Sequence, residues 1–298
     1  MDFDLTDEER LIRKQVSEFA STEIAPIAAV IDKEKSFPWE AVKKTAELNL
    51  MGVYIPEEYG GAGLSTVSYA ITVEELSKVS ASIGVIVSVN NSLVCDPLYR
   101  WGTDPQKRKY LIPLAKGEKL GAYALTEPNA GSDAAAILTT AQRTSGGYLL
   151  NGSKMWVTNG NEAQVFIVYA RTGPLEERHR NIDAFIVERD FQGFHVTSTI
   201  DKLGIRGSSS TEILLKDCFV PEENLLGEVN GGFKVAMTTL DAGRIGIGAQ
   251  AVGIAQASLD ASIAYAKSRV AFGQPIAEFQ AIQWMIADMA VETEAARV

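Results

Sequence analysis

The sequence predicts an α+β fold in which a helical part, a β-sheet part and a second helical part follow one another along 298 residues. Two changes of hydrophobic period indicate this order. Apolar residues have helical spacing in the first third, form short runs in the middle, and return to helical spacing from Gly232. Because a chain of this length has room for two or three ordinary domains, we expect them at 1–119, 120–228 and 229–298.

The first third begins with the pattern of a capped helix. Thr6 and Glu9 have the spacing of a capping box. The apolar face that follows them consists of Ile12, Val16 and Phe19.

Another helix start is expected at Asp104 and Pro105. Asp104 can cap the helix, and Pro105 suits the first helical position because no N–H is needed there. We expect this helix to run through Leu111, with two more helices between the two starts.

The middle third has the pattern of an antiparallel β domain. Apolar runs at 165–170 and 184–187 have the length of strands, and Gly146 with Gly147 signals a turn between two further strands. The change from helical spacing to short runs separates this part from its neighbours.

The last third predicts two helices. The apolar stripe of the first consists of Phe233, Met237, Leu240, Ile247 and Ile254. After Pro275, a bundle seam is predicted at Phe279, Ile282, Ile286, Met289 and Thr293. Residues 292–298 keep a helical pattern without a Gly, Asn or Pro to end it, so we expect an incomplete, truncated bundle with an exposed apolar stripe.

Composition excludes several classes of function. The formal net charge of -10 argues against nucleic-acid binding, which needs clustered Lys and Arg. Cys95 and Cys218 lie far apart without neighbouring ligands, so they indicate neither a disulfide framework nor a zinc site. The chain has only two histidines, His179 and His195, which argues against a Ser-His-Asp or metal-histidine mechanism.

The amino-terminal sequence and the longest apolar stretch bear on location. Residues 1–8 are acidic and lack the basic start and apolar core of a signal or transit peptide. The stretch 82–89 is followed by Asn90, Asn91 and Asp96 and is too short to span a bilayer. We therefore expect no membrane span and a cytoplasmic protein, as in a bacterium, or a mitochondrial matrix protein after processing.

The most informative segment is Tyr-Ala-Leu-Thr-Glu-Pro-Asn-Ala-Gly-Ser-Asp at 123–133. A strand-like entry runs into a turn in which Gly131 allows close approach of a ligand and Ser132 offers a hydroxyl. Exposed amides of such a turn form a concave site for phosphate oxygens. A pyrophosphate is therefore a suitable ligand here.

A second segment, Trp-Val-Thr-Asn-Gly at 156–160, adds an aromatic side chain and a hydroxyl on one face of a strand. Trp156 and Thr158 are two positions apart, so they point the same way. A flat heteroaromatic ring needs a surface over its face and a donor to a ring nitrogen. Together the two segments indicate a flavin site.

Two other interpretations of 123–133 stay open at this point. The segment has the Thr, Asn, Ser and Asp content of an ordinary loop held by side-chain to backbone hydrogen bonds. Alternatively, Glu127 and Asp133 form a carboxylate pair for acid and base work on a sugar.

These two motifs resemble the flavin-binding signature of the acyl-CoA dehydrogenases, most of all the short-chain, butyryl-type members. The likeness covers the chain from its first residues. It continues through Leu-Gly-Ile-Arg-Gly-Ser-Ser at 203–209, Leu-Asp with Gly-Arg-Ile at 240–245, and Arg269 with Ala-Phe-Gly at 271–273. The resemblance implies an N-terminal helical domain, a middle β domain and a C-terminal helical bundle.

The resemblance also implies a reaction: FAD-dependent oxidation of the α,β carbon pair of a short-chain acyl-CoA thioester to the 2-enoyl-CoA. Electrons then pass to an electron-transfer flavoprotein, and the enzyme is a homo-oligomer, either a dimer or a tetramer. Oxygen-using oxidation on the same scaffold remains an alternative.

Site residues follow from the resemblance position by position. Flavin and pyrophosphate contacts fall on Tyr123, Leu125, Thr126, Gly131, Ser132, Trp156, Val157 and Thr158. Contacts to the dinucleotide across a subunit interface fall on Arg269, Phe272 and Gln280. Substrate contacts fall on Ser132, Phe233, Leu240, Asp241 and Arg244.

The catalytic base is a glutamate in this family, and the chain offers none at the matching positions. Most relatives carry it in later helices, beyond Val298 here. Others carry it one residue before the arginine of Leu-Asp-x-x-Arg, which is Gly243 in this sequence. We expect no catalytic base among these residues. The alternative is an inactive short form that binds flavin or acyl-CoA, or that caps a partner's helix bundle.

Overall fold

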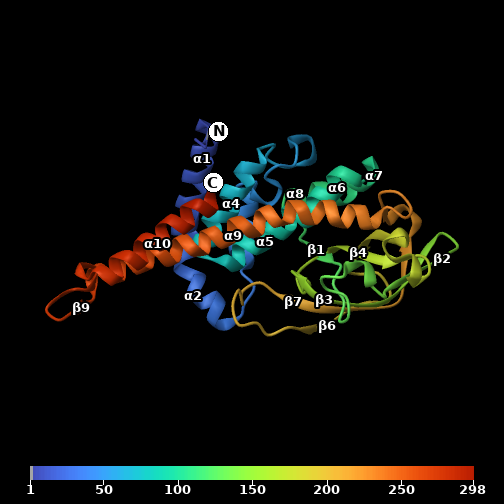
Figure 1. Cartoon of the computed structure of the whole chain (residues 1–298). Helices are drawn as coiled ribbons and strands as arrows, with labels where there is room; N and C mark the ends of the chain where they lie inside the picture. The colour runs from blue at the N-terminus through green and yellow to red at the C-terminus, as the bar shows by residue number, and fades with distance from the viewer. Residues whose placement is uncertain (1–2) are drawn as a thin grey trace.

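The structure, a computed structural model, describes residues 3–298; Met1 and Asp2, with which the first predicted domain starts, lie outside the described residues. A helical part, a twisted sheet and two long C-terminal helices follow in the predicted order (Figure 1). The predicted α+β fold class is therefore confirmed.

The first helix, α1 (Asp7–Phe19), has the predicted capping box. The Thr6 hydroxyl accepts the Glu9 N–H at 3.2 Å, and the Glu9 carboxylate accepts the Thr6 N–H at 2.9 Å. The remaining helices of this part are α2 (Ala25–Glu34), α3 (Trp39–Glu47), α4 (Thr66–Val79), α5 (Ala81–Ser88), α6 (Asp96–Trp101), α7 (Asp104–Gln106) and α8 (Ile112–Ala115). The prediction of two helices between the two starts is wrong, since α2 to α6 all lie there.

The predicted cap at Asp104 is also wrong by one residue. Thr103 is the cap: its hydroxyl accepts the Gln106 N–H at 3.4 Å, and the Gln106 side chain accepts the Thr103 N–H at 2.9 Å. Asp104 is then the first helical residue, with Pro105 inside the first turn. A threonine and a glutamine three positions apart make a full capping box, which a lone aspartate does not.

Residues 81–101 form one continuous helical segment, in which a π-helical stretch (Val89–Cys95) joins α5 to α6. Asn90 and Asn91 do not interrupt it, because both side chains are buried and bonded: Asn90 donates to the Met51 carbonyl at 2.8 Å, and Asn91 accepts the Val53 N–H at 2.6 Å. By length and composition the segment could cross a membrane, yet 83% of its apolar window is buried inside the protein. Such burial is typical of a core helix.

The strands are β1 (Gly121–Ala124), β2 (Thr140–Thr144), β3 (Gly147–Thr158), β4 (Val165–Arg171), β5 (Ile182–Glu188), β6 (Phe194–Thr199), β7 (Ser210–Pro221) and β8 (Leu225–Leu226). They form one sheet in the order β6-β7-β3-β2-β4-β5-β8. The predicted Gly146–Gly147 turn lies between β2 and β3. The prediction of a purely antiparallel sheet is wrong at two points, because β4 pairs in parallel with β1, Gly121 opposite Val165, and with β2, Thr140 opposite Arg171.

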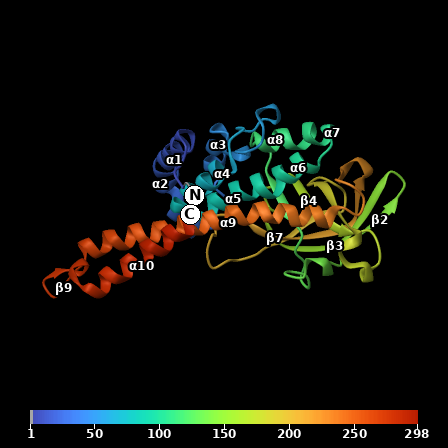
Figure 2. The same cartoon turned by 45° about the horizontal axis from the view of Figure 1, so that its top comes forward.

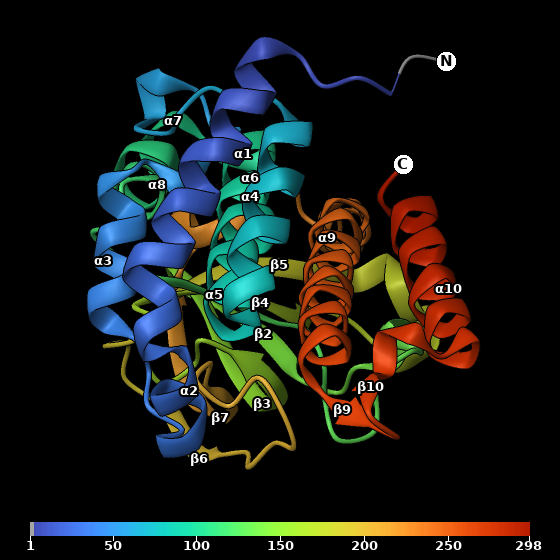
Figure 3. The same ribbon diagram turned by 90° about the vertical axis from the view of Figure 1, so that its left-hand side faces the viewer.

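The C-terminal helices are α9 (Gly232–Ser268) and α10 (Gln280–Arg297), joined by a short hairpin of β9 (Val270–Ala271) and β10 (Gln274–Pro275). Helix α9 lies between α4 and α5 on one side and α10 on the other (Figure 3). Towards the hairpin, α9 and α10 project beyond the rest of the molecule (Figure 2). The predicted seam of α10 from Phe279 to Thr293 holds the half-buried and buried positions of that helix.

The predicted stripe of α9 is partly wrong, since Ile247 and Ile254 are 49% and 41% exposed. The face that α9 buries is instead composed mostly of small residues: Gly232, Ala236, Thr239, Gly243, Gly246, Gln250 and Gly253. A Cβ on Gly246 would lie 2.1 Å from the Tyr69 hydroxyl oxygen, and one on Gly253 would lie 2.3 Å from the Glu74 carbonyl oxygen. Close approach of backbones, rather than bulky side chains, therefore defines this face.

The three parts share a hydrophobic core. One buried cluster contains Leu98 and Leu114 from the helical part, Ile167 and Ile186 from the sheet, and Ala236 from α9. Since the parts pack into each other here, the structure draws no boundary between them, and the predicted domain limits remain predictions.

Candidate functional site

A cavity of about 340 Å³ lies where the sheet faces the helices. Its helical wall consists of Val89, Leu93, Met237, Leu240 and Arg244. Its other wall consists of Tyr123, Leu125, Thr126, Gly131, Ser132, Ala134, Met155, Trp156 and Thr158. The cavity therefore joins both sequence motifs to the start of α9.

The turn after β1 gives the cavity one edge. Two backbone hydrogen bonds between Glu127 and Ala130, at 3.0 and 3.1 Å, close this turn and send the chain on to Gly131 and Ser132. A Cβ added to Gly131 would meet no atom within 4 Å, so the backbone is open to the cavity. This is the close approach that the glycine was expected to permit.

Strand β3 forms the opposite edge through an irregularity. Its register with β7 shifts between Lys154 and Val157, and Trp156 has a positive φ of 59°. Such a bulge redirects side chains, and here it leaves Trp156 56% exposed at the cavity. Trp156 and Thr158 share a face, whereas the Val157 side chain is buried in the core on the other face. The Val157 side chain therefore does not line the cavity, and the predicted contact of Val157 with the flavin remains a prediction.

Beneath these two edges lies an ion pair that the sequence did not indicate. Lys154 Nζ is 2.7 Å from the Glu127 carboxylate, and the Lys154 side chain is 0% exposed. Burial lowers the pKa of Lys154 to about 8, although the Glu127 carboxylate opposes that shift. Burial alone would raise the pKa of Glu127, but Lys154 and the hydrogen bonds from Thr139 and Leu138 outweigh it and lower that pKa.

Ion pairs of Glu127 and Asp133 bear on one of the other interpretations of 123–133, the carboxylate pair. Glu127 is engaged by Lys154, and Asp133 forms an ion pair with Arg178 at 2.7 Å. The carboxylate pair for sugar chemistry is therefore wrong, because neither acid is free to act.

One buried hydroxyl of the cavity has no hydrogen-bond partner within residues 3–298. The hydroxyl oxygen of Tyr123 is buried without a hydrogen bond. Burial raises the pKa of Tyr123, so this hydroxyl stays protonated and able to donate. An unsatisfied buried hydroxyl that lines a cavity is suited to a polar ligand.

Of the five predicted substrate residues, two lie outside the cavity and three, including Ser132, line it. Leu240 and Arg244 line the cavity. Phe233 instead packs on the ring of His179, with 5.4 Å between centroids. Asp241 lines a separate space beside Tyr54 and forms an ion pair with Arg244 on the exposed surface.

Three predicted cofactor residues lie far from this cavity. Arg269 and Phe272 belong to the connection between α9 and α10, which Figure 1 shows at the opposite end of α9, and Gln280 is the first residue of α10. Phe272 is 98% exposed. A single chain therefore does not bring these residues to the cavity.

Sequence reasoning missed Val89, Leu93, Ala134, Met155 and Met237 as cavity residues. Val89 and Leu93 lie in the π-helical stretch, 30 or more positions before the motif, and no local pattern connects the two segments. Met155 directly precedes Trp156, and the bulge turns it towards the cavity.

An apolar annex of about 280 Å³ continues from this cavity. Both spaces share Val89, Leu93, Leu240 and Arg244, and the annex adds Ser88, Ser92, Gly243 and Ile247. Neither lining contains a carboxylate or an imidazole. The combined space therefore suits a planar group next to a short apolar chain and carries no general base of its own.

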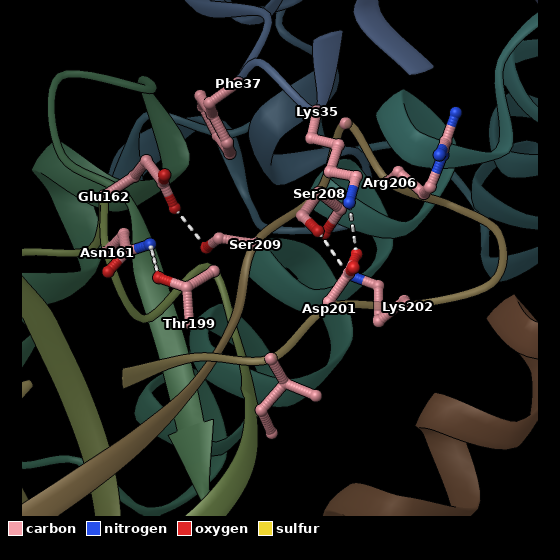
Figure 4. A pocket seen from close by; sticks show the side chains of 12 residues that line it. Lys35, Phe37, Asn161, Glu162, Thr199, Asp201, Lys202, Arg206, Ser208 and Ser209 are labelled. Carbon is pink, nitrogen blue, oxygen red and sulfur yellow. Dashed lines mark hydrogen bonds and ion pairs between the residues drawn. The ribbon is translucent and has the colours of Figure 1, made fainter. Parts of the chain in front are cut away.

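A second cavity, of about 310 Å³, separates α2 from the loop between β6 and β7. Figure 4 shows that its polar side chains bond to one another. Lys35 pairs with Asp201 at 2.6 Å, and Asn161 donates to Thr199 at 2.8 Å. Most charged side chains around this cavity bond to one another, and these contacts hold the β6–β7 loop against the helices. The cavity is therefore a weaker candidate for ligand binding than the first one.

Residues 3–298 contain no group of three His, Cys, Asp or Glu that could hold a metal ion. Cys95 and Cys218 are both buried and free.

Comparison with known families matches the chain in three consecutive parts. The acyl-CoA dehydrogenase N-terminal domain matches residues 6–118, the middle domain 122–218 and the C-terminal domain 230–298.

Among curated proteins, the chain is similar to the short-chain specific acyl-CoA dehydrogenase of Clostridium acetobutylicum, with 50% identity over 297 residues, 100% of this chain and 78% of that protein. It is 46% identical to the mitochondrial short-chain specific enzyme of Rattus norvegicus over 295 residues, 99% of this chain and 71% of that protein.

Solved structures show similarity to the same group of proteins. Butyryl-CoA dehydrogenase from Megasphaera elsdenii superposes with a TM-score of 0.97 at 42% identity, covering 100% of this chain and 78% of that one. A chain from the study of the electron transferring flavoprotein of Acidaminococcus fermentans has a TM-score of 0.97 at 46% identity, with the same coverage. Acyl-CoA dehydrogenase complexed with FAD from Bacillus anthracis has a TM-score of 0.91 at 39% identity, covering 99% and 50%.

Proposed function

The chain belongs to the acyl-CoA dehydrogenase family, and from this premise we propose that it takes part in FAD-dependent α,β-dehydrogenation of a short-chain acyl-CoA to the 2-enoyl-CoA. Membership makes it an oxidoreductase by family, with FAD as the cofactor. The observation that carries the proposal is the cavity, which lies between the two flavin motifs and opens into an apolar annex.

The residues present fit FAD. The Tyr123 hydroxyl lacks a partner, the Gly131 backbone is open, and Trp156 offers an exposed ring. Tyr123, Leu125, Thr126 and Ser132 would hold the cofactor from the turn, and Trp156 with Thr158 from β3. When bound, FAD supplies the hydride acceptor.

The helical wall positions the substrate. Leu240 and the annex around Leu93 and Gly243 exclude water from an acyl chain, and Arg244 offers a positive charge at the rim. A small, apolar annex favours short chains over long ones.

The proton acceptor is not among the residues that line the cavity or its annex. Gly243, which carries no side chain, occupies one wall of the annex at the position where some relatives have a glutamate. We infer that the base belongs to sequence beyond Val298, since the Clostridium relative is longer and the chain spans 78% of it.

We further infer a homo-oligomer, an electron-transfer flavoprotein as electron acceptor, and a location in the bacterial cytoplasm or the mitochondrial matrix. Exposed apolar side chains on α9 and α10, among them Ile247, Trp284 and Met285, support self-association. Relatives from Acidaminococcus and Rattus support the acceptor and the location.

The test is the absorbance spectrum, with and without butyryl-CoA, of the purified chain and of the same chain extended by the C-terminal segment of the Clostridium relative, which would supply the inferred base. Flavin bands near the usual visible maxima would support the cofactor site, and their bleaching by butyryl-CoA would show turnover. A colourless protein after reconstitution with FAD contradicts the proposal.

The absence of a carboxylate in the cavity favours a second candidate, a form that binds flavin or acyl-CoA without catalysis. In that case flavin bands appear and shift with butyryl-CoA but do not bleach. Bleaching excludes this candidate. Reoxidation by oxygen, compared with reoxidation by an electron-transfer flavoprotein, then separates an oxidase from a dehydrogenase.

A further inference from the structure

A buried crosslink connects the two segments that line the flavin cavity. Glu127 directly follows Leu125 and Thr126, and Lys154 directly precedes Met155 and Trp156. The 2.7 Å contact between Lys154 Nζ and Glu127 Oε1 therefore joins the turn to strand β3 immediately behind the cavity.

Other hydrogen bonds extend this crosslink. Lys154 also donates to the Leu125 carbonyl at 3.1 Å, and the Met155 N–H donates to the Thr126 carbonyl at 2.8 Å. The Glu127 carboxylate accepts the N–H groups of Leu138 at 2.6 Å and Thr139 at 3.0 Å. Three stretches of backbone are thereby held at fixed separations.

Stability alone does not account for such a pair. Removing two charges from water costs about as much as their attraction returns, and apolar residues of equal volume often serve as well. A fully bonded pair does fix the geometry of the groups it joins. The groups joined here are the ones that line the cavity.

We propose that Lys154 and Glu127 are positioning residues for the cofactor, holding the turn and β3 at the separation that FAD binding requires. This inference rests on the proposed function. It assigns a role to Glu127 and Lys154, neither of which is among the predicted cofactor contacts.

The protonation state of Lys154 gives the proposal a specific signature. With a pKa of about 8, Lys154 loses its charge as pH rises from 7 to 9. Because loss of this charge weakens the contact with the Glu127 carboxylate that holds the turn and β3 together, affinity for FAD falls in this window. The stability of the cofactor-free protein has the opposite trend. The folded pKa lies below the unfolded one, so the unfolded state binds more protons between them and stability rises with pH.

The experiment measures FAD dissociation constants by flavin fluorescence from pH 7 to 9.5. For the unmodified chain we expect affinity to fall by up to about tenfold between pH 8 and 9, following one titrating group. Lys154→Arg, which keeps the charge, should bind FAD at pH 7 and show no such fall. The double variant Glu127→Gln with Lys154→Met should bind at least tenfold more weakly at pH 7, again without pH dependence.

The matched control is Lys216→Met, which removes an exposed lysine from neighbouring strand β7 and should follow the unmodified chain. A flat pH profile in the unmodified chain overturns the inference, as does an unchanged profile in Lys154→Arg. If the unmodified chain binds no FAD at any pH, the proposed function itself fails. FAD binding with a flat profile removes only the positioning role.

Discussion

At the scale of single residues, the cavity is defined by polar groups that the protein leaves unsatisfied. Tyr123 and Tyr169 pack ring to ring with 5.1 Å between centroids, and both hydroxyls are buried without a hydrogen bond. Only Tyr123 lines the cavity. The two tyrosines therefore share chemistry and surroundings but differ in their access to the cavity.

This difference predicts the behaviour of Tyr123→Phe. Removing an unpartnered buried hydroxyl should leave the free energy of unfolding of the cofactor-free chain unchanged or raise it by about 1 kcal/mol. FAD affinity should fall about fivefold to tenfold, as for the loss of one hydrogen bond. Urea unfolding and fluorescence titration measure the two quantities.

Tyr169→Phe is the control for that prediction. It should have a similar effect on stability and none on FAD affinity. Equal losses of FAD affinity in both variants would mean that the Tyr123 hydroxyl has no direct contact with the cofactor.

At the scale of elements, helix α9 determines where the cavity ends. Its small residues bring the backbone close to α4 and α5, so that Leu240 and Arg244 reach the cavity from one helical turn. A face of larger residues would hold α9 farther from α4 and α5. The glycines of α9 therefore set the width of the site indirectly.

Gly253→Ala tests this packing. Its Cβ would lie 2.3 Å from the Glu74 carbonyl oxygen and 3.0 Å from the Lys78 nitrogen, so α4 and α9 must separate. Alanine has a helix propensity roughly 1 kcal/mol more favourable than glycine, but the steric clash costs more than that. We expect a loss of about 1–3 kcal/mol in the free energy of unfolding. The measurement is the urea unfolding midpoint.

Gly248→Ala on the same helix is the matched substitution, since its Cβ would meet no atom within 4 Å. It should stabilise the protein by about 0.5–1 kcal/mol. If both variants shift the midpoint in the same direction, close packing of α9 is not what the glycine at 253 provides.

At the scale of the whole molecule, the predicted cofactor residues fall into two groups that one chain keeps apart. On the order of 40 Å of helix separates Leu240 from Arg269, given about 1.5 Å of rise per residue. Helices α9 and α10 carry Arg269 and Phe272 away from the sheet to a projecting tip (Figure 2). The homo-oligomer proposed above would bring both groups to one dinucleotide site, with a second copy of the chain supplying the tip residues.

This separation predicts complementation between variants. Arg269→Ala should weaken FAD binding without altering the cavity of its own chain, and a bulky Gly131→Val should block that cavity. Mixing the two after unfolding and refolding should restore part of the FAD binding, since a mixed dimer contains one intact site. Flavin content and sedimentation velocity provide the measurement.

Mixing Arg269→Ala with Phe272→Ala is the control, because every site then lacks a tip residue. Full FAD binding by Arg269→Ala at dilutions where the chain is monomeric would contradict a shared site.

The candidate site shows which features the local sequence predicts and which it does not. Trp156 and Thr158 were placed on one face from strand periodicity, and the structure agrees because both line the cavity. The positive φ of Trp156 and the bulge around it were not foreseen, since they depend on pairing with β7. Lys154 resembled an ordinary strand residue, because its partner lies 27 positions away.

The sequence by itself determined the order of helical and β parts, the capping of α1, the seam of α10 and the two motifs of the cavity, because each depends on residues within a few turns or strands. Only the tertiary structure decided which face of α9 is buried, how Glu127 and Lys154 pair, and that Arg269 lies far from Tyr123. These features depend on close approach and burial between distant segments, which hydrophobic periodicity does not record.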